Sequence, residues 1–180
     1  MINVDSVLYK GRPDMKMSPV EEAIYDKLDS LSIEYFRSSH DAADTIEDCK
    51  QVENVLGCEI CKNLVLCNQQ KTKFYLLLMP GDKKFLTKVL SKEIGSSRLS
   101  FAPAEYLKKY LNVTPGSVSI LELIFDKDKN VNILIDSDLL KQEYIGCHPG
   151  KNTATLKIKS SDIFETFLKG IGRYYTTVDL

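Results

Sequence analysis

Lys62-Asn63-Leu64-Val65-Leu66-Cys67 and Lys73-Phe74-Tyr75-Leu76-Leu77-Leu78-Met79 are the two segments that decide the fold of this chain. Both are apolar runs of strand length, and the polar segment Asn68-Gln69-Gln70-Lys71-Thr72 between them predicts a buried β-hairpin. Outward from this hairpin, the other expected strands are residues 33–37, a second hairpin formed by 118–125 and 131–135, then 144–147 and 153–158.

Helix signals lie between these strands. Ser18-Pro19-Val20-Glu21 combines a capping box with a proline at the first helical position, which predicts a helix through about residue 31. Thr45-Ile46-Glu47-Asp48 begins a second helix that Gly57 ends. The remaining helical segments are expected at 85–94, 103–111, 138–142 and 161–168. Hairpins with helices between them favour an α+β fold over a parallel βαβ sheet.

Length and composition indicate one globular domain. The chain has 180 residues, of which 43% are apolar and 27% charged, and no tryptophan. Its formal net charge of -1 means that any RNA contact must be a local basic patch, and DNA is not an expected partner. Because no apolar run approaches the roughly 20 residues of a membrane span, we expect a soluble, cytoplasmic protein without a membrane partner.

The expected organisation is an arm at 1–17, the globular domain at 18–170 and a short tail at 171–180. The arm carries basic residues with little apolar periodicity. No fixed repeat or low-complexity linker divides the chain further.

Metal and common cofactor chemistries lack their signatures. The chain contains no GxSxG, GxGxxG, P-loop or HExxH motif, and no cofactor is expected. Cys58-Glu59-Ile60-Cys61 is a single CxxC, and a closed zinc site would need two more ligands from elsewhere in the chain. We therefore expect free thiols and no metal, while a small metal or redox protein built on Cys58 and Cys61 stays as a third hypothesis.

Three segments and one helix face are candidates for function, and each has a purely structural alternative. Lys62 opens an apolar strand, where its charge either meets an anion or extends to solvent. His148-Pro149-Gly150-Lys151-Asn152 is a pocket segment or a structural turn. Thr114-Pro115-Gly116-Ser117-Val118-Ser119 either presents backbone amides to an oxygen or is a plain turn. Lys84, Lys88 and Lys92, at a spacing of four, form a phosphate-binding ridge or a solvated helix face.

In combination, three segments resemble the YbaK/prolyl-tRNA-synthetase-associated editing domain family. They are Cys61-Lys62-Asn63-Leu64-Val65-Leu66, the loop 114–119, and Gly146-Cys147-His148-Pro149-Gly150-Lys151-Asn152-Thr153-Ala154-Thr155, in the order found in the family. Within the family the chain is most similar to free-standing prolyl-tRNA deacylases of the PrdX/ProXp-ala type. The resemblance implies a single α+β domain with a mixed, mostly antiparallel, β-barrel-like sheet and flanking helices.

The resemblance also implies an activity: trans-editing hydrolysis of the ester in mischarged tRNA, most of all Ala-tRNA(Pro), by a water that the substrate helps to activate. The implied catalytic residues are Lys62, which approaches the phosphate of the terminal adenosine, Gly116, whose loop holds the carbonyl, and His148 in the pocket. The implied substrate-binding residues are Asn63, Ser117, Val118, Ser119 and Asn152. Candidate contacts to the tRNA are Lys50, Lys84, Lys88 and Lys92.

One position departs from the family. The loop that begins at Gly116 has Ile120 at the fifth position, where the family pattern GxxxP has proline. This difference motivates the alternative hypothesis that the chain is a non-catalytic module that binds an amino acid or a charged tRNA.

Overall fold

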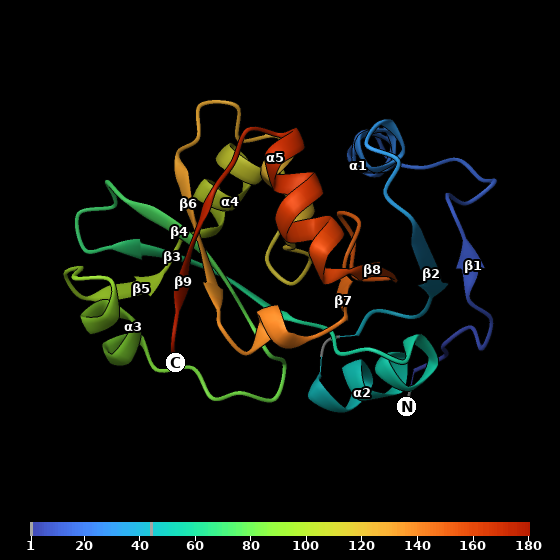
Figure 1. Ribbon diagram of the computed structural model, residues 1–180, viewed down its shortest axis with the longest axis horizontal. Helices are drawn as coiled ribbons and strands as arrows, with labels where there is room; N and C mark the ends of the chain where they lie inside the picture. The colour runs from blue at the N-terminus through green and yellow to red at the C-terminus, as the bar shows by residue number, and fades with distance from the viewer. Residues whose placement is uncertain (1, 44) are drawn as a thin grey trace.

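The computed structural model describes residues 2–43 and 45–180, which form two β-sheets side by side along the long axis of the molecule (Figure 1). One sheet is antiparallel, in the order β1-β2-β8-β7, and the other is mixed, in the order β5-β3-β4-β6-β9. The predicted α+β class, with mostly antiparallel pairing and flanking helices, is confirmed. The strands are β1 (Tyr9–Lys10), β2 (Tyr35–Ser39), β3 (Lys62–Asn68), β4 (Phe74–Met79), β5 (Leu99–Phe101), β6 (Val131–Asp136), β7 (Tyr144–Cys147), β8 (Ala154–Lys159) and β9 (Tyr175–Val178).

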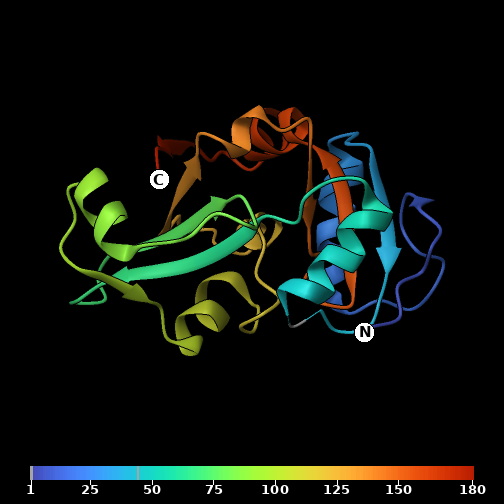
Figure 2. The same ribbon diagram turned by 90° about the horizontal axis from the view of Figure 1, so that it is seen from below.

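Helices surround the junction of the two sheets. Figure 2 shows the C-terminal helical segment on one side of this junction and α4 on the other. None of the helices among the described residues combines the length and apolar character that crossing a bilayer requires. The helices are α1 (Pro19–Ser30), α2 (Ile46–Leu56), α3 (Thr87–Glu93), α4 (Ala104–Leu111), α5 (Leu168–Gly170), the 3-10 helices η1 (Ile120–Ile124) and η2 (Leu139–Lys141), and the π-helix η3 (Asp162–Phe167).

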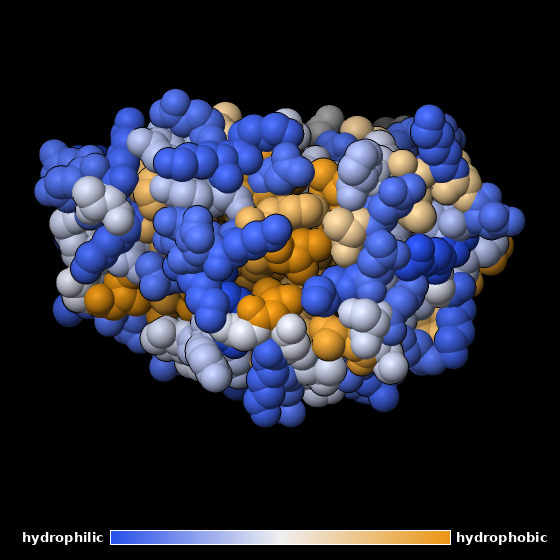
Figure 3. Space-filling view, turned by 90° about the horizontal axis from the view of Figure 1, so that it is seen from above, coloured by the Kyte–Doolittle hydropathy of each residue, from blue (hydrophilic) through white to orange (hydrophobic). Residues whose placement is uncertain are grey.

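The predicted hairpin is confirmed at the centre of the five-stranded sheet. β3 and β4 pair antiparallel from Lys62 opposite Met79 to Cys67 opposite Phe74. Side chains of both sheets share the main core, including Val65 and Leu76 from one and Leu156 from the other. Apolar atoms also reach the surface near the middle of the long axis, where hydrophilic groups surround them (Figure 3).

The predicted second hairpin is wrong. Residues 118–125 form no strand, because Ser119 and Glu122 close a capping box that begins the buried 3-10 helix η1. β6 pairs parallel with β4 and with β9 instead of turning back on its own predecessor. A short apolar run is compatible with a buried strand or a buried helix, and only the tertiary contacts decide between them.

Local capping signals were better predictors. At α1, Ser18 accepts from the amide of Glu21, and the Glu21 carboxylate accepts from the Ser18 amide. At α2, the Thr45 hydroxyl accepts from the Asp48 amide, and Gly57 ends the helix in the left-handed region with φ of 65°. Both predicted helix starts are thus confirmed.

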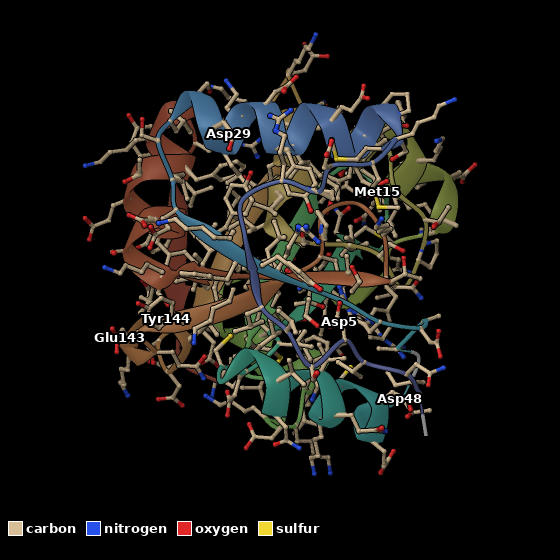
Figure 4. The ribbon with its side chains drawn as sticks, turned by 90° about the vertical axis from the view of Figure 1, so that its right-hand side faces the viewer. Asp5, Met15, Asp29, Asp48, Glu143 and Tyr144 are labelled. Carbon is tan, nitrogen blue, oxygen red and sulfur yellow. The ribbon has the colours of Figure 1, made fainter. Side chains whose placement is uncertain are left out.

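Both terminal segments contribute a strand where the sequence analysis assigned none. β1 pairs with β2, and the N-terminal segment that bears Asp5 and Met15 runs over the outside of this sheet (Figure 4). β9 pairs with β6 at the edge of the other sheet.

Ahead of β9, Arg173 is buried and donates to Asp126 Oδ2 at 3.0 Å and to the carbonyl oxygen of Val131. This ion pair fastens the last strand to the turn that begins β6.

Replacing Arg173 by alanine leaves the buried Asp126 carboxylate without its cation. We expect the free energy of unfolding to fall by about 3–5 kcal/mol, measured by urea denaturation. The matched control is Arg12→Ala, since Arg12 forms exposed ion pairs with Asp26 and Asp29 that contribute about 0–1 kcal/mol. Equal losses in the two variants would contradict the importance of the buried pair.

Candidate functional site

A cavity of about 640 Å³ lies where the start of β3, helix α2 and the loop before η1 meet. Its walls include residues from all three segments singled out in the sequence. They are Lys62 and Asn63 of β3, Gly116 and Val118 of the loop, and His148 after β7, with Lys50 of α2 beside them. Segments separated by more than 80 residues along the chain therefore meet around one space.

Other predicted site residues lie outside the wall of this cavity. Ser117 and Ser119 are buried residues of the loop itself, and the Asn152 carbonyl accepts from the Ala43 amide. Lys84, Lys88 and Lys92 are exposed and do not line the cavity.

The predicted lysine ridge is also wrong as a continuous helix face. α3 begins at Thr87, so only Lys88 and Lys92 lie on it. Lys84 lies before the helix, in a segment that its neighbour Lys83 anchors to the end of β6 and the turn after it. The Lys83 ammonium contacts Asp136 Oδ1 at 2.9 Å and Asp138 Oδ2 at 2.7 Å.

Lys62 stands at the first position of β3 and is partly buried. Its ammonium donates to the Lys83 carbonyl oxygen at 2.7 Å, which places it against the 80–86 segment. A carbonyl oxygen takes only one of the three ammonium protons, so the group can still donate to an anion.

Asn63 presents an unsatisfied acceptor. Its Nδ2 donates to the Cys61 carbonyl oxygen at 2.9 Å, whereas its buried Oδ1 has no hydrogen-bond partner among the described residues. Burying an acceptor without a donor costs about 1–3 kcal/mol. Because Asn63 lines the cavity, a ligand that brings an N–H or O–H group would remove this cost.

His148 is held as one neutral tautomer. Its Nδ1 lies 3.0 Å from the Ala154 carbonyl oxygen, which can only accept, so Nδ1 carries the proton. Burial lowers the pKa of His148, and the ring is neutral at pH 7. Nε2 is then an acceptor.

A second histidine, His40, is linked to His148 through the Thr155 hydroxyl. His40 Nδ1 lies 2.8 Å from the Asp41 carbonyl oxygen and carries the proton by the same reasoning, so the Thr155 hydroxyl donates to His40 Nε2 at 2.9 Å. The Thr155 oxygen in turn lies 3.3 Å from His148 Nδ1. Sequence reasoning missed Thr155, because nothing local to β8 links it to His40.

Ser119 and Glu122 tie the loop 116–119 to the His148 segment. The Ser119 hydroxyl donates to the His148 carbonyl oxygen at 2.7 Å. The fully buried Glu122 carboxyl accepts from the amides of Ser119 and Gly150, and burial raises its pKa to about 8. Ile120 is completely buried at the first position of η1, where proline is also well accommodated.

Acidic side chains also line the cavity, and the sequence analysis did not identify them. Glu53, Glu59 and Asp82 line the cavity. Glu53 accepts from the Ile60 amide at 2.9 Å, and burial raises the pKa of its carboxyl. The cavity is therefore lined by side chains of both charges, which suits a ligand that carries both charges.

The cysteines carry reduced thiols. Burial raises the pKa of Cys58 to about 12, so this thiol stays protonated at neutral pH. Across residues 2–43 and 45–180, no three His, Cys, Asp or Glu side chains are grouped as metal ligands would be.

Comparison with known proteins gives consistent matches. The family model described as "Aminoacyl-tRNA editing domain" matches residues 40–166. The prolyl-tRNA editing protein ProX of Acetoanaerobium sticklandii is 32% identical over 160 residues, which cover 89% of this chain and 97% of that protein. The prolyl-tRNA synthetase associated domain-containing protein 1 of Danio rerio is 26% identical over 162 residues, covering 89% and 88% of the two chains.

A solved structure gives the same fold. A crystal structure described provisionally as a trans-editing enzyme for prolyl tRNA synthetase superposes with a TM-score of 0.69 at 17% identity. The superposition covers 92% of this chain and 99% of the other, and at this identity it establishes the fold alone.

The raised pKa of Glu122 predicts a pH-dependent stability. The carboxyl stays protonated in the folded chain up to about pH 8, whereas in the unfolded chain it ionises near 4.5. Both histidines have lowered pKa values in the folded chain and ionise near 6.5 in the unfolded chain, so their opposing contribution fades above about pH 7 and this carboxyl then dominates. From there to pH 8 the folded state holds the additional proton, and the free energy of unfolding should fall by up to about 1.4 kcal/mol per pH unit.

Glu122→Gln should remove this slope, while the exposed Glu105→Gln should keep it. Urea denaturation at several pH values across the window measures both. A wild-type stability that is flat between pH 7 and 8 would contradict a protonated Glu122.

Proposed function

Since the chain belongs to the aminoacyl-tRNA editing domain family, we propose that it hydrolyses the ester bond of mischarged tRNA in trans, with Ala-tRNA(Pro) as its substrate. The observation that carries this proposal is the meeting of Lys62, the Gly116 loop and His148 around one cavity. The similarity to ProX supports a free-standing prolyl-tRNA deacylase of the PrdX/ProXp-ala type.

The proposed chemistry needs positioning more than a strong nucleophile, because an aminoacyl ester is already reactive. Water adds to the ester carbonyl, the bond from the carbonyl carbon to the ribose 3′ oxygen breaks, and that oxygen takes up the proton which the water loses. The substrate's own 2′-hydroxyl relays this proton. The products are the free amino acid and a tRNA with a free 3′-hydroxyl.

Two groups of the chain position the ester in this proposal. Lys62 binds the phosphate of the terminal adenosine through the ammonium protons that the Lys83 carbonyl leaves available. In the loop with φ of 87° at Gly116, the Val118 amide donates to the oxyanion that develops on the carbonyl, because the neighbouring Ser117 and Ser119 amides already donate to the Thr114 carbonyl oxygen and to Glu122.

His148 and Asn63 bind the amino acid's ammonium group. Nε2 of the neutral imidazole is an acceptor, and so is the unpartnered Oδ1 of Asn63. An ammonium group supplies donors to both of these acceptors. The acidic residues Glu53 and Glu59 line the same cavity. This role for His148 is favoured over that of general base because burial lowers its pKa.

Selection between amino acids is proposed to be steric. Val65, Leu107 and Val118 are buried apolar side chains on the cavity wall. A missing methylene in a larger pocket gives a difference in binding free energy of roughly 1–3 kcal/mol. A wall that admits a methyl group and excludes the proline ring by size gives a larger difference.

Ile120 is compatible with activity in this proposal. Proline at the first position of a helix preorganises the loop through its fixed φ, and here the capping box of Ser119 and Glu122 performs the same task. The loop is therefore expected to hold its amides in place without the ring.

Removing the Lys62 ammonium tests the positioning of the 3′ end. We expect Lys62→Ala to lower kcat/KM for Ala-tRNA(Pro) by about 100-fold, since small misplacements of a reacting group cost that much. Lys169→Ala, an exposed lysine on α5, is the control and should hydrolyse at the wild-type rate. Undiminished hydrolysis by folded Lys62→Ala would disprove the lysine assignment.

Substrate choice tests the function itself. Purified protein should release alanine from Ala-tRNA(Pro), and leave Pro-tRNA(Pro) intact, in an assay that follows loss of the ester and includes Cys-tRNA(Pro). If charged tRNA binds but no ester is lost, the chain is the binding module of the alternative hypothesis and the hydrolase proposal is wrong.

A further inference from the structure

Phe101 is an exposed aromatic ring at the edge of the cavity. It ends the short edge strand β5, lines the cavity, and is 62% exposed. Leu86, just before α3, and Val89, within it, are also large apolar residues that are exposed. Helix α3 packs against β5 at the same end of the sheet (Figure 1). Grouped exposed apolar side chains of this kind mark binding surfaces.

Strand register places the ring on the same sheet face as Lys62. Phe101 lies opposite Leu66, and side chains directly opposite each other in an antiparallel pair point to one face. Alternation along β3 puts Leu64 and Lys62 on that face too. Leu66 lies four residue steps along the strand from Lys62, which is roughly 13 Å.

The ladder is open at its Lys62 end, while Leu66 itself is buried in the core beneath α3. β5 pairs with residues 66–68 of β3, and the Ala102 amide donates to the Val65 carbonyl oxygen, where the ladder ends. Phe85 packs edge-on to Phe101, with ring centroids 6.2 Å apart and planes at 64°. This contact orients the Phe101 ring. The large exposed area of the ring leaves it available for stacking.

Charge identifies the occupant. Residues 84–98, beyond the ion-paired Lys83, carry four basic side chains and one acidic one, in a chain whose formal net charge is -1. Lys84 and Lys88 are exposed in this segment, next to the exposed apolar side chains. An exposed aromatic ring together with a basic segment is the combination that binds single-stranded nucleic acid, by stacking on bases and pairing with phosphates.

We infer that Phe101 is a stacking platform for a base of the unpaired 3′ end of the tRNA, which enters the cavity past this ring. This inference rests on the proposed function, because it assumes that the cavity receives the charged end of a tRNA. Phe101 is a positioning residue: it binds RNA and touches no reacting atom. A partner protein with an apolar surface is the competing occupant.

The absence of tryptophan from the chain allows a direct test of stacking. Phe101→Trp introduces the sole indole, whose fluorescence should be quenched by an RNA hairpin with an unpaired CCA 3′ end and not by the same hairpin with a blunt end. The control is Tyr174→Trp, a residue that is 84% exposed and does not line the cavity, and it should respond to neither RNA.

Kinetics give an independent readout. Phe101→Ala should raise KM for Ala-tRNA(Pro) about tenfold and leave kcat within about twofold, while Phe101→Tyr should keep the wild-type KM. An unchanged KM in Phe101→Ala, or equal quenching of Phe101→Trp by both RNA hairpins, would overturn the platform and leave the proposed hydrolysis standing. If the wild-type protein hydrolyses no ester, the proposed function fails, and quenching specific for the unpaired end still decides whether Phe101 stacks on RNA.

Discussion

The buried carboxyl of Glu122 is the constraint on which the site depends. It accepts from the amides of Ser119 and Gly150, and Ser119 donates to the His148 carbonyl oxygen, so two segments about 30 residues apart share one set of hydrogen bonds. Burial would make an ionised carboxylate costly, and the raised pKa removes that cost by keeping the group neutral. The loop and the histidine are thereby held at a constant relative position.

The site lies at the junction because neither sheet supplies all of it. The five-stranded sheet contributes Lys62 and Asn63 at the start of β3, whereas His148 follows β7 of the other sheet. The short β5 pairs only with residues 66–68 of β3, so the first residues of β3 are not covered by it and lie beside the cavity. A short edge strand, a capped loop and a buried histidine thus form one concave surface.

Predictions from sequence succeeded where the determining contacts are local. The caps at Ser18 and Thr45 involve residues three apart, and the β3–β4 hairpin involves adjacent segments. The prediction for residues 118–125 failed because the apolar run was interpreted as a strand, whereas Ser119 and Glu122, which have the spacing of a capping box, begin a buried 3-10 helix. Lys84 was placed on a helix because nothing local shows that Lys83 is held by Asp136, more than 50 residues away.

The sequence by itself determined the α+β class, the central hairpin and the three segments from which the cavity is built, since apolar periodicity, caps and a few distinctive residues are written along the chain. The tertiary structure decided which side of each segment faces the cavity, the tautomer of His148, the unsatisfied oxygen of Asn63 and the exposed ring of Phe101. These properties depend on burial and on hydrogen bonds between distant segments, and both exist only when the two sheets have packed together.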